Sequence, residues 1–162
     1  MAQATPPQPG QRSTTSWPAS SLPNAAAAIL GGREALGWRV DTDADMTKAV
    51  EGGFSVTTLD ALKRHGVTDQ EIGRLIVKPR TLSHRRTGNG RLTVEESDRA
   101  ARVARVIALA ERTFANREKA RLWLHKNIAS LDDRRPMDLI RTAVGTRLVE
   151  DILAKIAWGA AA

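Results

Sequence analysis

The residues with the clearest chemical potential form a basic stretch that contains no acid. Between Glu71 and Glu95 there is no other Asp or Glu, and much of the chain's net charge of +7 comes from this stretch. Its six bases are Arg74, Lys78, Arg80, Arg85, Arg86 and Arg91. Lys and Arg at this density neutralise phosphates, and Arg can also pair with guanine edges. The alternative is an ordinary solvated surface, but the surrounding pattern favours phosphate binding.

That surrounding pattern predicts two short helices joined by a tight turn. Thr68 to Glu71 is a capping box for the first helix, and Pro79 suits the first position of the second, which Gly88 and Gly90 end. This arrangement is a helix-turn-helix, whose second helix lies in the major groove of DNA. With Leu82 turned inward, the candidate DNA-binding residues are Lys78, Arg80, Thr81, Ser83, His84, Arg85, Arg86 and Arg91.

Further capping and breaking signals predict helices on both sides of this motif. Upstream, Ala25 to Leu30 and a segment capped by Asp45 are expected to be helical. Downstream, a capping box at Thr93 to Glu96 opens the longest helix, which runs through Phe114. Asn116 caps another helix, Pro136 starts a short one, and Gly145 is expected to separate that one from the last.

The last helix carries an apolar stripe and ends close to a tryptophan. Leu148, Val149, Ile152, Leu153 and Ile156 recur at helical spacing, a pattern that fits a core face, a dimer interface or a partner-binding surface. Core packing is the commonest of these outcomes. Trp158 favours an interface, because only a few small residues follow it and buried aromatic residues often anchor interfaces.

These signals predict an all-α protein with an aliphatic core. Residues 1–24 contain five of the seven prolines and are expected to form a disordered tail. Residues 25–100 are expected to form the helix-turn-helix domain. Residues 101–162 are expected to form a second, smaller helical domain, for whose apolar stripe core packing, dimerisation and partner binding all stay open at this point.

The same sequence offers little for catalysis. It has no Cys and no Tyr, its histidines (His65, His84 and His125) are far apart, and no glycine-rich phosphate loop is evident. We therefore expect no catalytic, metal-binding or cofactor-binding residues and no small-molecule substrate. The longest apolar run, Ala25 to Leu30, is too short to span a membrane, so a cytoplasmic protein is expected.

From about residue 53 to residue 159 the chain resembles the Xre/MbcA/ParS-type antitoxins, which have a C-terminal toxin-binding domain formerly called DUF2384. The resemblance lies in a set of short motifs that follow one another in the family's order. They are Arg80-Thr81-Leu82, Gly90 to Arg99, Ala110 and Phe114, Ala120 with Trp123-Leu124, Pro136 to Leu139, Thr142, Gly145, Val149-Glu150, Leu153 and Trp158-Gly159.

The resemblance implies an antitoxin of a type II toxin–antitoxin system. It implies that the helix-turn-helix half binds operator DNA as a homodimer and represses its own operon. It also implies that the C-terminal half neutralises a RES-domain toxin, an enzyme that consumes NAD, by blocking its active site. Carried over by position, the toxin-binding candidates are Glu150, Leu153, Lys155, Ile156, Trp158 and Gly159.

One other function remains open at this point. The chain could be a stand-alone dimeric helix-turn-helix transcription regulator that has no toxin partner. In that case the C-terminal stripe would only pair two copies of the chain. A RES-domain reading frame beside this gene would favour the antitoxin.

Overall fold

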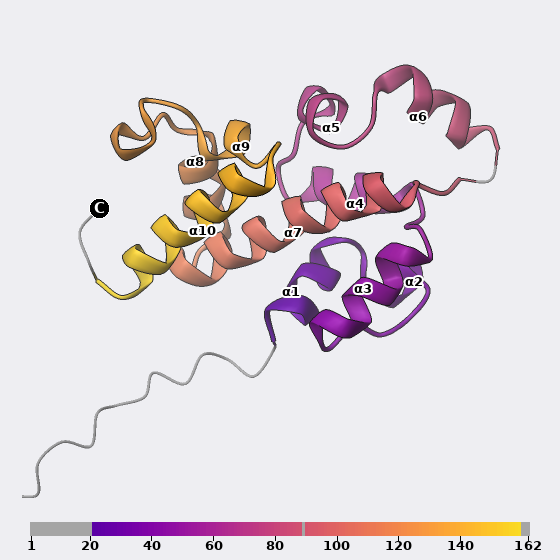
Figure 1. The fold of residues 1–162 in the computed structure, drawn as a ribbon, viewed down its shortest axis with the longest axis horizontal. Helices are drawn as coiled ribbons and strands as arrows, with labels where there is room; N and C mark the ends of the chain where they lie inside the picture. Colours follow the sequence, from indigo (N-terminus) through magenta and orange to yellow (C-terminus); the bar gives the residue numbers. More distant parts are fainter. Residues whose placement is uncertain (1–20, 89, 160–162) are drawn as a thin grey trace, which may run out of the picture.

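The computed structural model describes residues 21–88 and 90–159, and most of these residues lie in helices (Figure 1). Within them there is no β-strand, only two isolated bridges that join Ser55 to Arg91 and Ile128 to Arg134. The all-α prediction is confirmed. The helices are α1 Leu22–Ile29, α2 Gly32–Leu36, α3 Asp43–Glu51, α4 Thr57–Arg64, α5 Asp69–Leu75, α6 Pro79–Arg86, α7 Val94–Phe114, α8 Arg117–His125, the 3-10 turn η1 Ala129–Leu131, α9 Pro136–Leu139 and α10 Ala143–Ala157.

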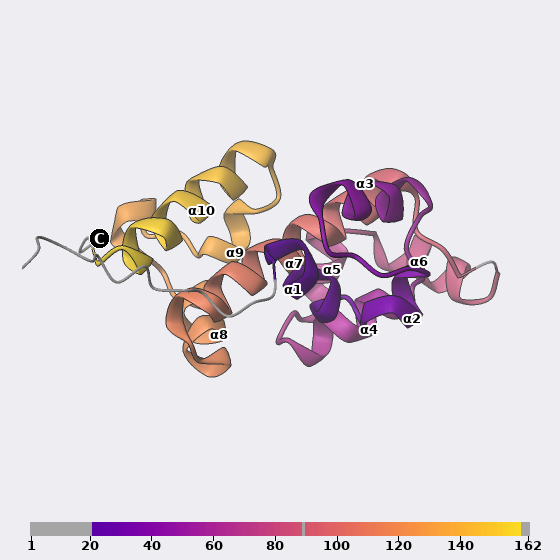
Figure 2. The same ribbon diagram turned by 90° about the horizontal axis from the view of Figure 1, so that it is seen from below.

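Helix α7 is the axis of the molecule. Helices α1, α3 and α4 pack on it from the N-terminal part of the chain, and α8 and α10 pack on it from the C-terminal part. Figure 2 shows these two groups at the two ends of α7. The predicted domain boundary between residues 100 and 101 therefore falls inside one continuous helix, whose buried Val103, Val106 and Ile107 belong to a core shared by both groups.

Local capping explains where most helices begin. The predicted boxes are present: the Thr68 and Thr93 hydroxyls accept the backbone N–H groups of Glu71 and Glu96, whose carboxylates reach back. Asn116 caps α8 as expected. The start of α3 differs, because Asp45 is not its cap. Thr42 is the cap, and Asp45 is the acidic member of a third capping box.

The N-terminal tail is shorter than predicted. Helix α1 begins at Leu22, and the Ser21 hydroxyl caps it by accepting the N–H of Asn24 at 3.3 Å. The Asn24 side chain also donates to the carbonyl of Val40 at 3.1 Å, which ties α1 to the segment before α3. Residues 21–24 thus belong to the folded part, while the rest of the predicted tail, residues 1–20, lies outside the described residues.

Gly145 lies inside α10 and does not separate α10 from α9. The cap of α10 is Thr142, whose hydroxyl accepts the N–H of Gly145 at 3.1 Å. A Cβ atom at Gly145 would lie 2.1 Å from the carbonyl oxygen of Leu139. The glycine is therefore required by the close approach of α10 to the end of α9, and its backbone φ is ordinary. Among the described helices, none is long and apolar enough to cross a membrane.

Candidate DNA-binding and partner-binding surfaces

Helices α5 and α6 form the predicted helix-turn-helix. Ile72 and Leu75 of α5 are buried in the core, and Leu82 of α6 packs partly against it. The two helices approach closely where a Cβ at Gly73 would lie 3.3 Å from the ring of Pro79. Arg99 of α7 fixes the turn between them, because its Nε donates to the Ile76 carbonyl at 3.0 Å. Helix α7 thus supports the motif through the hydrogen bond from Arg99 to the α5–α6 turn.

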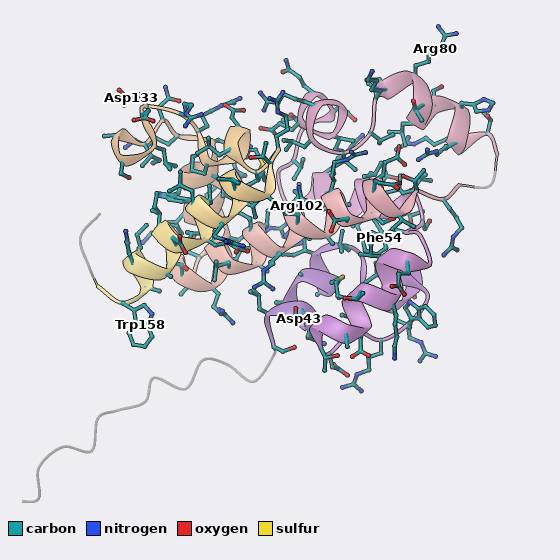
Figure 3. All side chains as sticks on the ribbon, in the orientation of Figure 1. Asp43, Phe54, Arg80, Arg102, Asp133 and Trp158 are labelled. Atoms are coloured by element: carbon teal, nitrogen blue, oxygen red, sulfur yellow. The ribbon has the colours of Figure 1, made fainter. Side chains whose placement is uncertain are left out.

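The outer face of α6 is available to a ligand. No residue of α6 is fully buried, and Lys78, Arg80, Thr81, Ser83 and His84 are exposed. Figure 3 shows Arg80 pointing away from the body of the molecule. Guanidinium, hydroxyl and imidazole groups on an exposed helix are suited to base edges and phosphate oxygens.

The other three candidates have partners inside the protein. Arg85 forms an ion pair with Glu96 of α7, and Arg86 pairs with Asp60 of α4 at 2.8 Å. Arg91 donates to the carbonyl of Gly53 at 2.7 Å. These contacts hold α6 against α4 and α7, and the following loop against the turn after α3. Since each guanidinium has five N–H donors, a DNA contact through a spare donor stays a prediction.

The stripe on α10 divides into a buried part and an exposed part. Val149 and Leu153 are fully buried and Ile152 nearly so, while Ile156 is partly buried. Core packing therefore accounts for most of the stripe. This placement corrects the assignment of Leu153 as a toxin-contact residue, since its side chain packs inside the protein.

The remaining C-terminal candidates lie toward the end of α10. Trp158 is 86% exposed, and Figure 3 shows it pointing away from the helix end. Lys155 and Gly159 are exposed too. Glu150 is half-buried and accepts a hydrogen bond from Nε of Arg105 at 2.8 Å, which places it at the α7–α10 contact. The structure thus brings an exposed aromatic and a cation together at one helix end.

Comparison with known proteins identifies both halves. The model of the antitoxin Xre-like helix-turn-helix domain matches residues 45–105, and that of the antitoxin Xre/MbcA/ParS C-terminal toxin-binding domain matches residues 109–159. The chain belongs to the Xre antitoxin family. It is 36% identical to an antitoxin Xre of Pseudomonas putida over 73% of this chain and 74% of that one. It is 31% identical to an antitoxin Xre of Yersinia enterocolitica over 94% of this chain and 95% of that one.

In this Xre-family chain, a pair formed by a buried carboxylate and a half-buried histidine joins the two halves. His125 at the end of α8 places Nε2 3.1 Å from Oε1 of Glu71 in the first turn of α5. Burial raises the pKa of Glu71, but hydrogen bonds from His125 and from the Thr68 backbone outweigh it and lower that pKa to about 2. The hydrogen bond to Glu71 raises the pKa of His125 above its ordinary value.

A second link between the halves runs parallel to the first. Arg74 of α5 forms an ion pair with Asp138 of α9, which also accepts two hydrogen bonds from Arg135. Hydrogen bonding to Arg135 lowers the pKa of Asp138. Sequence reasoning missed both links. A charged pair that joins helices more than 50 residues apart leaves no local signal in the sequence.

Proposed function

We propose that this chain is the antitoxin of a type II toxin–antitoxin system whose toxin is a RES-domain enzyme that consumes NAD. In this proposal the end of α10 enters the toxin's active site and blocks it. The chain itself catalyses nothing, and it acts in the cytoplasm. The observation that carries the proposal is Trp158, a large exposed aromatic at the end of a helix whose other face is firmly packed in the core.

The end of α10 is both rigidly held and exposed. Val149 and Leu153 anchor α10, so the end of the helix is presented without a large loss of conformational entropy on binding. An exposed Trp gains more from burial at an interface than almost any other side chain. Lys155, a predicted polar partner of the toxin, and Gly159 are exposed beside it. Ile156 supplies a partly exposed apolar margin.

The same proposal assigns operator binding to α6. A homodimer of the chain would place two copies of α6 in successive major grooves, and binding there would repress the operon. Arg80 and its exposed neighbours on α6 support this assignment, since they face away from the protein. We assign DNA binding to α1–α6 with the first half of α7, and toxin binding to the remaining helices.

Co-expression with the product of the adjacent gene tests the proposal. A tagged copy of this chain should co-purify a RES-domain protein, and it should restore NAD levels in cells that express that protein. Failure to bind any neighbouring RES-domain protein would overturn the antitoxin assignment. The alternative is a stand-alone dimeric regulator. Val144 and Leu148 on α10 favour it, because these exposed apolar side chains could pair two copies of the chain. That alternative predicts operator binding and dimerisation without a toxin.

A further inference from the structure

A basic hollow lies where the two halves of the chain meet. Its volume is about 380 Å³, and it is bounded by the end of α5, the α5–α6 turn, the first half of α7 and Arg141 between α9 and α10. Lys78, Thr81 and Arg141 are exposed, so the hollow opens to solvent. Its polar side chains are Arg74, Lys78, Thr81, Glu96, Arg99 and Arg141.

The charge in this hollow is strongly positive. Four cationic side chains face a single carboxylate, that of Glu96, which is already bound by Arg85 and by the Thr93 backbone N–H. Arg74 is paired with Asp138, and Arg99 donates from Nε to the Ile76 carbonyl and also attracts the Glu95 carboxylate. Neither Lys78 nor Arg141 forms an ion pair with any of the described residues. The hollow therefore has N–H donors and positive charge in excess.

The position of the hollow beside α6 indicates which anion it would bind. It adjoins the beginning of α6, and Lys78 and Thr81 belong both to its wall and to the predicted DNA-binding face. A helix lying in the major groove has a phosphate backbone on either side, and contacts to those phosphates orient the protein on the duplex. A small free anion has no such reason to be held beside α6.

We propose that this hollow binds a backbone phosphate of operator DNA, and that Arg141 and Arg99 are DNA-binding residues. Arg141 lies within the residues that match the toxin-binding domain. The DNA footprint therefore extends beyond the helix-turn-helix onto the C-terminal half. The inference rests on the proposed operator binding.

The test compares Arg141→Ala with Arg147→Ala in the full-length chain. Arg147 is a matched control, since it is an exposed arginine of α10 that does not line the hollow. Binding is measured by fluorescence anisotropy, at several salt concentrations, to a duplex from upstream of the gene and to one of unrelated sequence. We expect Arg141→Ala to weaken binding to both duplexes about 3- to 10-fold and to reduce the salt slope by about one. Arg147→Ala should match the wild type.

An Arg80→Ala variant separates this inference from the proposed function. If Arg80→Ala weakens operator binding while Arg141→Ala behaves like Arg147→Ala, the hollow is not a DNA contact and the inference is wrong. If Arg80→Ala and Lys78→Ala both bind DNA like the wild type, the proposed DNA-binding surface itself is wrong. Millimolar inorganic phosphate at constant ionic strength should leave the effect of Arg141→Ala intact. Loss of that effect would indicate a free-anion site and would also contradict the inference.

Discussion

Nε2 of His125 lies 3.1 Å from Oε1 of Glu71, so the end of α8 is bonded to the first turn of the helix-turn-helix. Glu71 is only 4% exposed, and its carboxylate also accepts the backbone N–H of Thr68 at 2.9 Å. One carboxylate thus caps α5 and binds the C-terminal half. On the other side of the ring, Nδ1 of His125 lies 2.8 Å from the Arg121 carbonyl. With an acceptor at each nitrogen, the doubly protonated ring is favoured.

This pair predicts a pH window for stability. The pKa of Glu71 is lowered from 4.5 to about 2, so its contribution is present above pH 4.5 and is lost as the pH falls toward 2. The pKa of His125 is raised from 6.5, so its contribution is present below pH 6.5 and is lost as the pH rises through the raised value. The pair should stabilise the fold most between about pH 4.5 and 6.5.

Urea unfolding of the wild type and of His125→Ala at pH 6 and pH 8.5 checks this. We expect the variant to lose roughly 1–3 kcal/mol at pH 6, because a buried carboxylate loses its partner. The loss should be smaller at pH 8.5, because the wild-type ring loses its proton as the pH rises through its raised pKa. An equal loss at both pH values would show that the ring acts by packing and not by charge.

Arg80 is exposed on α6, whereas Arg85 forms an ion pair with Glu96, so we expect substitutions at these two residues to have different effects. Arg80→Ala should weaken operator binding by about 10-fold or more if the side chain reaches a base, with little change in stability. Arg85→Ala removes the ion-pair partner of buried Glu96 and should lower the free energy of unfolding by roughly 1–3 kcal/mol. DNA titration and urea unfolding measure the two effects. Unchanged DNA binding in Arg80→Ala would show that Arg80 does not contact the operator, and unchanged binding in Lys78→Ala as well would exclude the exposed face of α6.

Gly145 is predicted to be intolerant of a side chain. In Gly145→Ala the new Cβ would meet the Leu139 carbonyl oxygen, a backbone atom that cannot move without displacing α9. We expect a loss of about 3 kcal/mol or more in the free energy of unfolding. Gly52→Ala is the control, since its nearest Cβ contact is 3.5 Å and its φ is −70°. Equal stability of the two variants would contradict the close approach of α9 and α10.

The exposed tryptophans provide a matched pair for toxin binding. Trp158 is 86% exposed at the end of α10, and Trp38, in the N-terminal group of helices, is 50% exposed. Trp158→Ala should change stability by less than about 0.5 kcal/mol, yet raise the Kd for the toxin at least about 10-fold. Trp38→Ala should leave the Kd unchanged. Calorimetry with purified toxin measures both, and an equal effect of the two variants would count against α10.

The parts of the fold that sequence predicted well are those encoded locally. Thr68 with Glu71 and Thr93 with Glu96 are only three residues apart, so each box is visible as a pattern and is present in the structure. Pro79 starts α6 for an equally local reason, its fixed φ. The same kind of local signal predicted that helices follow α6 and in which order they come.

The features that escaped prediction depend on contacts between distant residues. The role of Gly145 depends on where the Leu139 carbonyl lies, and the partners of Arg85 and Arg86 come from α7 and α4. Periodicity placed Leu153 on an apolar stripe but could not separate a core residue from an interface residue. Only packing against α7 makes that distinction.

The most direct test of the account is inhibition of the toxin by a chain that lacks residues 154–162. Leu153 is the last fully buried residue of α10, so the shortened protein should keep its core and its DNA affinity. In a purified assay of NAD consumption by the neighbouring RES-domain protein, the full chain should stop NAD loss at equimolar concentration. The shortened protein should leave NAD loss unchanged. Full inhibition by the shortened protein would contradict the claim that the end of α10 blocks the active site.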